Sequence, residues 1–474
     1  MTENHTSPKG GVDVRLADCL VQADIHTLQA IARHYQFSCA LYSKNEMIQE
    51  ILHHFRINPQ FQLEQTAQEY LQNPIYARLA LHKTGFFAKE EIQAMFQSNP
   101  TDSLDLQEAI SRGWLIPIRK YNGDTIYVLP DELREHLLYS VIDQMREKLV
   151  FHEDDENISL DKTSVLSDLH TFLQYTERHQ VQLTVNGSIY KRQLTQILEL
   201  MSTPEEIPVE SWRFGYGRRF HDYPDRFALL YDFSYFTGLL EEQEVGQLII
   251  NSSHPWLQKG NYEQLQSLFE FYIRSYRRPL PRLPLILSLL IHLSESWVRE
   301  DTVYEVIQHF LSDFYFDSKE QVWKQRILQM LHYLGIVHLH QETFSDSIHN
   351  WFQMSKLGLQ LLLGDIKLSE EKIRPNATLH VHPNFEIVIS SPTHPFFVEL
   401  GRFAEMMEST ESYLRFRITE QRVQDGLAAG YSLSDWLERL SKQTALAIPG
   451  NVERTLQKWS NRGIQKEVKS LIED

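Results

Sequence analysis

Two Asn-Gly dipeptides, Asn122-Gly123 and Asn186-Gly187, each lie between short β-prone runs in a sequence that otherwise has helical periodicity. Asn-Gly suits a tight hairpin turn, because both residues adopt a positive φ easily. Before the first dipeptide, residues 74–111 contain three runs of helical character. Three helices closed by a hairpin predict a winged-helix module, a helix-turn-helix variant, at residues 71–150.

Beyond residue 150 the alternation of helical and β-prone runs continues, less regularly than in the first module. No fixed repeat of about 20–50 residues is present, so the chain is not a solenoid. The pattern predicts an α+β fold, mainly helical with small β-hairpins. Its expected parts are an N-terminal helical module at 1–70, a winged-helix-like module at 71–150, a second and a third at 151–275, a helical or winged-helix-like module at 276–374 and a C-terminal α/β module at 375–474.

In the N-terminal module, apolar positions at helical spacing predict a pair of helices joined by a short loop within residues 16–56. Ser43 is the expected N-cap of the second helix, and Glu46, three residues later, completes a capping box. Small helical pairs of this kind serve as docking or DNA-end-binding units, although any helical hairpin has the same pattern.

Several modules are expected because 474 residues exceed what one hydrophobic core holds, roughly 100–200 residues. The most apolar run, 283–293, is far shorter than the ~20 residues that span a bilayer, and the first fifteen residues are polar. Only Cys19 and Cys39 occur, too few for a disulfide framework. We therefore expect a cytoplasmic protein that has no membrane contact.

The net charge of -17 argues against binding nucleic acid by bulk attraction, because phosphate contacts need local positive potential. Much of the excess lies at 131–170, which holds eleven acidic and four basic residues. Its centre, 152–157, has the composition of an exposed linker, and such a charge run is usually a solvated surface.

Motifs that carry catalytic chemistry are missing from the sequence. A helicase or ATPase motor needs a glycine-rich loop that ends in Gly-Lys, and the chain has no Gly-Lys dipeptide. The zinc motif H-E-x-x-H, the nucleophile elbow G-x-S-x-G and the dinucleotide loop G-x-G-x-x-G are absent too. His380 and His382 would share one face of a strand, but two ligands do not make a metal site. We expect no enzyme, no metal, no cofactor and no small-molecule substrate.

Two basic segments contrast with the acidic background. Segments 212–220 and 273–282 combine arginines with aromatic residues, a composition that suits pairing with phosphates and stacking on bases. The same composition is typical of hot spots in protein interfaces, and arginines also gather at helix ends without any binding role. The candidate binding residues are Arg213, Arg218, Arg219, Arg274, Arg277, Arg278 and Arg282.

A specific order of elements follows in the last hundred residues. A strand at 383–388 precedes a helix with Leu400, Phe403 and Ala404, and a second strand covers 413–419. A helix ending at Gly430, a helix that Ser432 caps and the run 448–452 before Trp459 complete the order. About 85 residues here resemble the helicase-associated domain shared by the N-terminal region of XPB-type DNA repair helicases and a set of bacterial relatives. That domain is not catalytic, so the resemblance implies an accessory function that places a motor against a partner or DNA.

Within this stretch, Arg415 and Arg417 lie two residues apart on a strand. They are therefore expected on the face opposite Leu414, Phe416 and Ile418, where they would be surface contacts for a partner. The alternative is structural pairing with nearby acids, because exposed ion pairs are common. The candidate acids are Glu399, Glu405 and Glu420.

The sequence as a whole favours an accessory or scaffold protein that docks on an XPB-like DNA helicase. In this hypothesis the C-terminal module and the acidic surface bind the helicase, and the winged helices guide DNA during repair. The rival hypothesis is a winged-helix DNA-binding regulator that acts alone, which the negative net charge disfavours. An enzyme without a recognisable motif is the third alternative.

Overall fold

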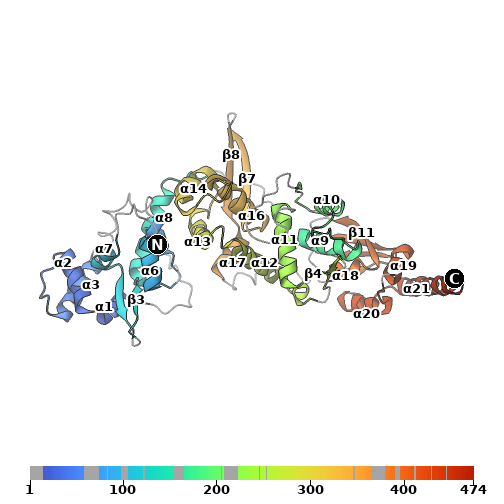
Figure 1. Ribbon diagram of the computed structural model, residues 1–474, viewed down its shortest axis with the longest axis horizontal. Coiled ribbons are helices and arrows are strands. Elements are labelled where there is room, and N and C mark those ends of the chain that lie inside the picture. The colour runs from blue at the N-terminus through green and yellow to red at the C-terminus, as the bar shows by residue number, and fades with distance from the viewer. Residues whose placement is uncertain are drawn as a thin grey trace. The chain divides into compact units, whose positions relative to one another are not determined.

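The fold is a helix-rich α+β arrangement with small antiparallel sheets (Figure 1). Contacts divide the chain into two compact units, which are described separately below: unit 1 is Met1–Leu160, Arg282–Lys324 and His338–Ser355, and unit 2 is the rest. The computed structural model describes residues 14–57, 74–82, 84–97, 105–120, 123–152, 165–203, 205–207, 223–244, 246–251, 254–344, 347–364, 379–389, 396–409, 413–428, 430–444 and 446–473.

Unit 1 begins with three helices where the sequence predicted a pair: α1 (Leu16–Gln22), α2 (Ile25–His34) and α3 (Lys44–Ile57). Asp24 separates α1 from α2, because its carboxylate accepts a hydrogen bond from the Thr27 N–H at 2.7 Å and caps α2. Ser43 caps α3 by accepting from the Glu46 N–H at 3.4 Å. The Glu46 carboxylate accepts from the Ala40 N–H instead, so the expected capping box is only half formed.

A run of helix, strand, two helices and two strands follows the first three helices. The sequence pattern missed the short first strand, which pairs with the last strand and makes the sheet order β1-β3-β2. Gly123, at the hairpin, has φ +90, as its turn requires; Asn122 lies outside the described residues. The elements are α5 (Pro74–Ala80), β1 (Phe86–Ala88), α6 (Lys89–Gln97), α7 (Leu106–Ser111), β2 (Ile116–Arg119) and β3 (Thr125–Val128), followed by α8 (Asp131–Arg146).

The same order recurs between residues 283 and 354, again with the first strand beside the last in the sheet order β6-β8-β7. The last two strands form the long hairpin labelled in Figure 1. The elements are α13 (Leu283–Leu293), β6 (Val298–Arg299), α14 (Glu300–Ile307) with a 3-10 turn η4 (Gln308–Phe310), the continuous helix α15 (Lys319–Gln321), η5 (Val322–Leu328) and α16 (Gln329–Tyr333), and the strands β7 (Val337–Phe344) and β8 (Ser347–Met354).

Unit 2 contains a further occurrence, with one hairpin in the described part of 165–251. Its first strand is reduced to the isolated bridges of Leu183 with Ile189 and of Gln182 with Gln247. Gly187 of the second Asn-Gly dipeptide has φ +78 and closes a turn by donating to the Thr184 carbonyl at 2.7 Å. The elements are α9 (Val165–Arg178), α10 (Lys191–Leu200), α11 (Asp225–Thr237), β4 (Leu240–Glu242) and β5 (Leu248–Ile250), then η3 (Pro255–Gln258) and α12 (Asn261–Tyr276).

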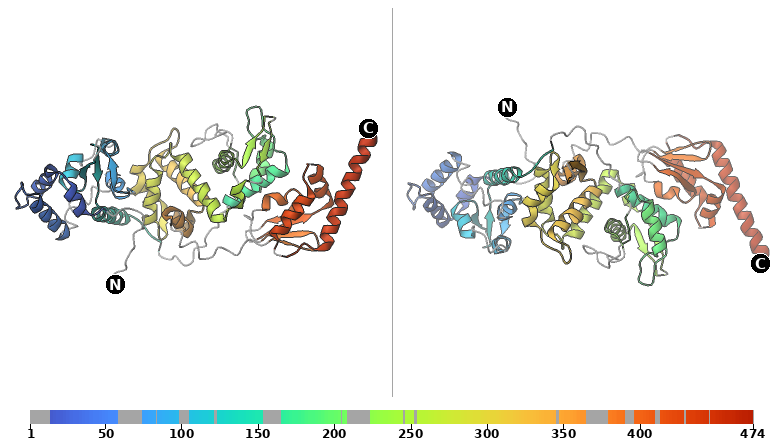
Figure 2. Two further views of the ribbon diagram at one scale, coloured as in Figure 1. Left: turned by 90° about the horizontal axis from the view of Figure 1, so that it is seen from below. Right: turned by 90° about the horizontal axis from the view of Figure 1, so that it is seen from above.

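The C-terminal part of unit 2 is a four-stranded antiparallel sheet, in the order β11-β12-β10-β9, with helices around it (Figure 2). The sequence predicted a helix through Phe403 and Ala404, and this was wrong. Helix α18 ends at Leu400, and Ala404 pairs with Ile418 in the sheet. The elements are α17 (Lys356–Leu363), β9 (Leu379–Val381), β10 (Glu386–Ile389), α18 (Phe397–Leu400), β11 (Ala404–Ser409), β12 (Leu414–Ile418), α19 (Glu420–Ala428), α20 (Leu433–Gln443) and α21 (Gly450–Glu473).

The caps and the core of this C-terminal part follow the sequence prediction. Gly430 has φ +85 after the end of α19, and the Ser432 hydroxyl accepts from the Asp435 N–H at the start of α20. Trp436 is fully buried, and its indole N–H donates to the Glu399 carbonyl at 2.9 Å. In neither unit is any described helix both long and apolar enough to cross a membrane.

Candidate partner and nucleic-acid surfaces

Three of the candidate arginines, Arg274, Arg277 and Arg278, are exposed at the C-terminal end of α12. This is the negative end of the helix dipole, which favours cations, so part of their placement is explained by the helix alone. Segment 208–222, with Arg213, Arg218 and Arg219, lies outside the described residues. The structure therefore bears on only one of the two basic segments.

One aromatic ring lies beside Arg274, and two further aromatic residues adjoin that ring. The Arg274 guanidinium lies 5.5 Å from the centre of the Phe271 ring, and the Phe271 ring is 6.2 Å from Phe236 on α11. Phe236 is 60% exposed and lies 5.5 Å from the ring of Tyr235. We call these four residues the Arg–aromatic surface. It borders a shallow hollow that is lined by Tyr235, Phe236, Gly238, Leu240, Glu241 and Glu242.

The chemistry of the Arg–aromatic surface suits either nucleic acid or a protein. An exposed phenyl ring such as that of Phe236 stacks on bases of any sequence, and a guanidinium pairs with phosphate, whereas Phe271 is buried. The same groups are hot-spot residues in protein interfaces. Glu241 and Glu242 in the adjoining hollow would repel phosphate, so a nucleic-acid strand would have to follow the arginine side of this surface.

Arg282, the last candidate of the segment, has a structural contact in unit 1. Its guanidinium donates to the His309 carbonyl at 3.1 Å. It is also close enough to Arg78 to act on it: burial lowers the pKa of Arg78, and the charge of Arg282 lowers it further. Arg282 therefore has at least one role in holding unit 1 together.

Arg415 and Arg417, the candidates for partner docking, alternate with buried apolar residues as the sequence predicted. On β12, Leu414, Phe416 and Ile418 are buried, whereas Arg415 is half-buried and Arg417 is exposed. The partner of Arg417 was not among the acids expected from the sequence. Its guanidinium donates at 2.9 Å to the carboxylate of Glu386, which lies opposite it on the neighbouring strand β10.

Glu386 is held as an anion by two neighbours. The Asn384 amide donates to its carboxylate at 3.0 Å, and this bond, followed by the Arg417 contact, lowers the pKa of Glu386. In the register of the sheet, Arg417 also lies opposite Glu405 on β11. Arg417 is thus placed between two acids, and Arg415 lies opposite Val388 on β10 and opposite Glu408 on β11.

In many winged-helix proteins the helix before the hairpin enters the DNA groove. In the first and second of these runs along the chain, protein contacts cover this helix. In unit 1, α2 packs on α7, and the Tyr35 hydroxyl donates to the Arg112 carbonyl just after α7 at 3.0 Å. A Cβ on Gly113 would come within 3.2 Å of the Phe55 ring of α3. The N-terminal helices therefore cover α7.

In unit 2 the corresponding helix is α11, which is buried over eight consecutive positions, 227–234. A helix segment that is buried on every side belongs to a core and cannot present a face to a groove. Its neighbours include α12 and β4.

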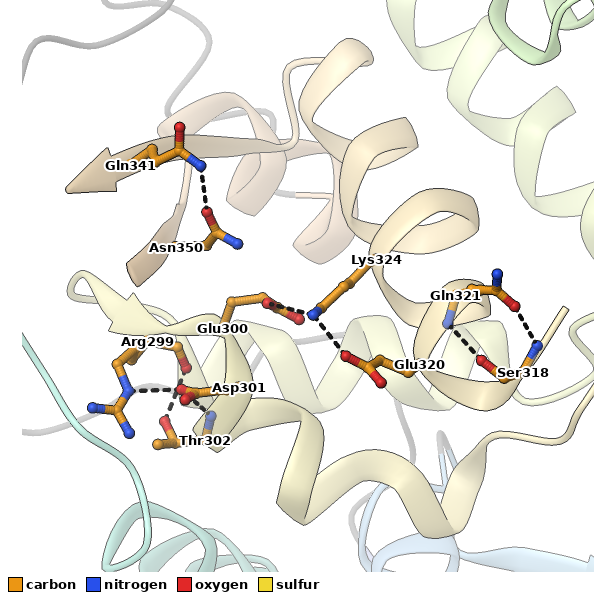
Figure 3. A network of polar contacts seen from close by, with 10 residues as sticks. All are labelled: Arg299, Glu300, Asp301, Thr302, Ser318, Glu320, Gln321, Lys324, Gln341 and Asn350. Carbon is orange, nitrogen blue, oxygen red and sulfur yellow. Dashed lines mark hydrogen bonds and ion pairs between the residues drawn. The ribbon is translucent and has the colours of Figure 1, made fainter. Parts of the chain in front are cut away.

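In the remaining corresponding helix, α15 with η5, the cation Lys324 is engaged locally (Figure 3). The Lys324 ammonium donates to Glu320 at 2.7 Å and lies 3.7 Å from Glu300, whose side chain is almost fully buried. Burial raises the pKa of Glu300, and the charge of Lys324 opposes that rise. Ser318 and Gln321 form a capping box that fixes the start of this helix.

A buried ion pair that the sequence did not reveal joins the C-terminal part of unit 2 to α9. Arg402 and Glu177 lie 2.8 Å apart, and both side chains are less than 10% exposed. The Arg402 guanidinium lies 4.7 Å from the Tyr431 ring, and the Tyr431 hydroxyl donates to Glu177 at 3.3 Å. The two charges are 225 residues apart in the chain, so no local pattern could have linked them.

Among the described residues, no group of three or more His, Cys, Asp or Glu side chains is arranged to hold a metal ion. No protein-family model matches the chain, and no curated protein matches it.

Proposed function

We propose that this protein is a non-catalytic accessory subunit of the cytoplasm that docks on an XPB-like DNA helicase and helps to guide DNA in repair. One observation carries most of the argument. The order helix, strand, helix, helix, strand, strand occurs twice in the described chain, each time with the first strand paired with the last. A third run, within 165–251, has the same order with its first strand reduced to isolated bridges. This is the order of a winged helix, and tandem winged helices are units that bind partners or DNA.

The packing of these units favours docking over the rival function of a stand-alone winged-helix regulator. A regulator of that kind reads bases with an exposed, polar or basic helix. Here α7 is covered by α2, α11 is buried at 227–234 and Lys324 is paired with two acids. The units therefore serve better as a scaffold than as base readers, and DNA contact falls to the Arg–aromatic surface.

Docking is assigned to the face of β12 that carries Arg415 and Arg417. Arg417 is exposed, and its pair with Glu386 is a surface ion pair, which is worth little and is easily exchanged for a partner's carboxylate. The resemblance of residues 380–459 to the helicase-associated domain supports the same assignment, because that domain places a motor against a partner.

The test measures binding of the full chain to the purified XPB-like helicase by isothermal titration calorimetry. Changing both Arg415 and Arg417 to Glu should weaken binding at least tenfold, because like charges would then oppose each other in the interface. The matched control changes Arg454 and Lys458, exposed on α21, to Glu and should leave affinity unchanged. The chain alone should hydrolyse no ATP. Absence of binding by the wild-type chain would disprove the docking function.

A further inference from the structure

Two aromatic side chains project from a tight turn between α14 and α15 in unit 1. Phe314 and Asp317 exchange both backbone hydrogen bonds, at 2.9 and 3.0 Å, and so close a two-residue turn of Tyr315 and Phe316. Tyr315 is 77% exposed and Phe316 is 79% exposed. Isolated apolar side chains on a surface are ordinary, but two adjacent aromatics at a turn tip form an unusual exposed feature.

The backbone at this turn is also unfavourable. Tyr315 has φ +52, in the left-handed region that glycine and asparagine adopt readily and a bulky aromatic residue does not. Strained backbone that persists in a fold is frequent at functional sites, where the surrounding structure holds it in place. Here Asp317 is buried on one side of the tip, and the next residue, Ser318, begins a capped helix (Figure 3). The backbone that carries the two rings is therefore held in place on its C-terminal side.

The charges near the turn indicate what it can bind. Asp313 and Glu320 are exposed on either side of the tip. The Asp313 carboxylate accepts a hydrogen bond from the backbone N–H of Lys319 at 2.9 Å. Two cations, Lys319 and Lys324, follow the tip, and Lys324 is already paired with Glu320. The three acids Asp313, Asp317 and Glu320 outnumber them. An acidic surrounding repels the phosphates of DNA and attracts Lys and Arg side chains.

We propose that the Tyr315–Phe316 turn is a docking knob that enters an apolar pocket with a basic rim on the helicase partner. The proposal rests on the proposed function, because it names a second contact with the same partner. A helicase surface near its DNA path carries the positive charge that complements the acidic surroundings of the knob. Rigid aromatic side chains lose little conformational freedom on binding, which is why they dominate the energetics of many interfaces.

The experiment measures the affinity of the full chain for the purified XPB-like helicase by isothermal titration calorimetry. Tyr315→Ser together with Phe316→Ser should weaken binding at least tenfold while the circular dichroism spectrum and Tm are retained. Tyr42→Ser, which removes an aromatic that is 88% exposed elsewhere in unit 1, is the matched control and should bind as wild type. The exchange of Tyr315→Phe with Phe316→Tyr keeps both rings and should restore binding.

Each other outcome has a distinct meaning. If wild type and the double serine variant bind equally, the knob is wrong and the accessory function stands. If wild type does not bind the helicase, both proposals fall. Light scattering that shows a wild-type dimer lost in the serine variant would make the occupant a second copy of this chain. Loss of affinity for a DNA oligonucleotide in the same variant would show that the turn binds nucleic acid. Either of these two results would contradict the proposal that the turn docks on the helicase.

Discussion

At the scale of single residues, His170 shows how burial sets a titration. It lies inside unit 2 on α9, where its imidazole is fully buried and Nε2 is 3.2 Å from the Gln264 side-chain oxygen. Burial lowers the pKa of His170 from 6.5 to about 4, because the charged imidazolium cannot be hydrated there. The folded chain therefore holds a neutral His170 at pH values where the unfolded chain is already protonated.

We expect this difference to make stability depend on pH. Above about pH 6.5 the neutral His170 does not lower the stability of the fold. As the pH falls toward about 4, protonation of His170 in the unfolded chain lowers the free energy of unfolding, and the loss reaches about 3 kcal/mol. Urea unfolding of the wild type and of His170→Gln should be compared at pH 7.5 and pH 5. The variant should lose less stability on acidification than the wild type, and parallel pH profiles would contradict the assignment.

At the scale of elements, helix α19 packs closely on the turn between α18 and β11 because Gly426 has no side chain. A Cβ at this position would lie 2.6 Å from the Arg402 carbonyl oxygen and 2.7 Å from the Phe403 ring. Neither atom can move away easily, since one is backbone and the other belongs to a buried ring.

Gly426→Ala should therefore destabilise unit 2 by roughly 2 kcal/mol, even though alanine favours helix by about 1 kcal/mol over glycine. Gly450→Ala is the control, because its nearest neighbour is the flexible end of Arg454 at 3.7 Å. That variant should be as stable as the wild type or slightly more stable. Thermal unfolding followed by circular dichroism measures both, and equal Tm values for the two variants would refute the close approach.

A further prediction at this scale concerns the ion pair of Arg402 and Glu177, which joins α9 to the C-terminal part of unit 2. Glu177→Gln or Arg402→Met alone should each cost roughly 3 kcal/mol, because each leaves a buried charge without its main partner. The double variant should cost clearly less than the sum, since it leaves neither charge behind. Urea unfolding of the four proteins gives the coupling energy, and additive costs would show that the pair contributes nothing specific.

At the scale of the whole molecule, a chain of net charge -17 can contact DNA only where cations are concentrated. Changing the exposed residues Arg274, Arg277 and Arg278 to Ala should weaken binding of a single-stranded oligonucleotide and should flatten its dependence on salt, as loss of phosphate contacts does. Fluorescence anisotropy across a salt series measures both effects. An unchanged salt slope would assign these arginines to a protein partner or to solvent.

Local patterns in the sequence determined much of the C-terminal part. The Ser432 cap and the left-handed Gly430 follow from side-chain and backbone preferences that act within a few residues. Trp436 in the core and the alternation around Arg417 follow from the repeats of a helix and a strand. The α+β class and the hairpin at Gly123 were predicted for the same reason.

Tertiary structure alone decided which distant residues meet. Ala404 is in a strand because β12 offers it a partner, although its neighbours have helical spacing. Arg417 pairs with Glu386, and Arg402 with Glu177, because strand order and helix packing bring them together across the chain. The burial of α11 is likewise set by what packs around it. Such contacts depend on the path of the whole backbone, and the free energy that fixes them is not encoded in any short segment.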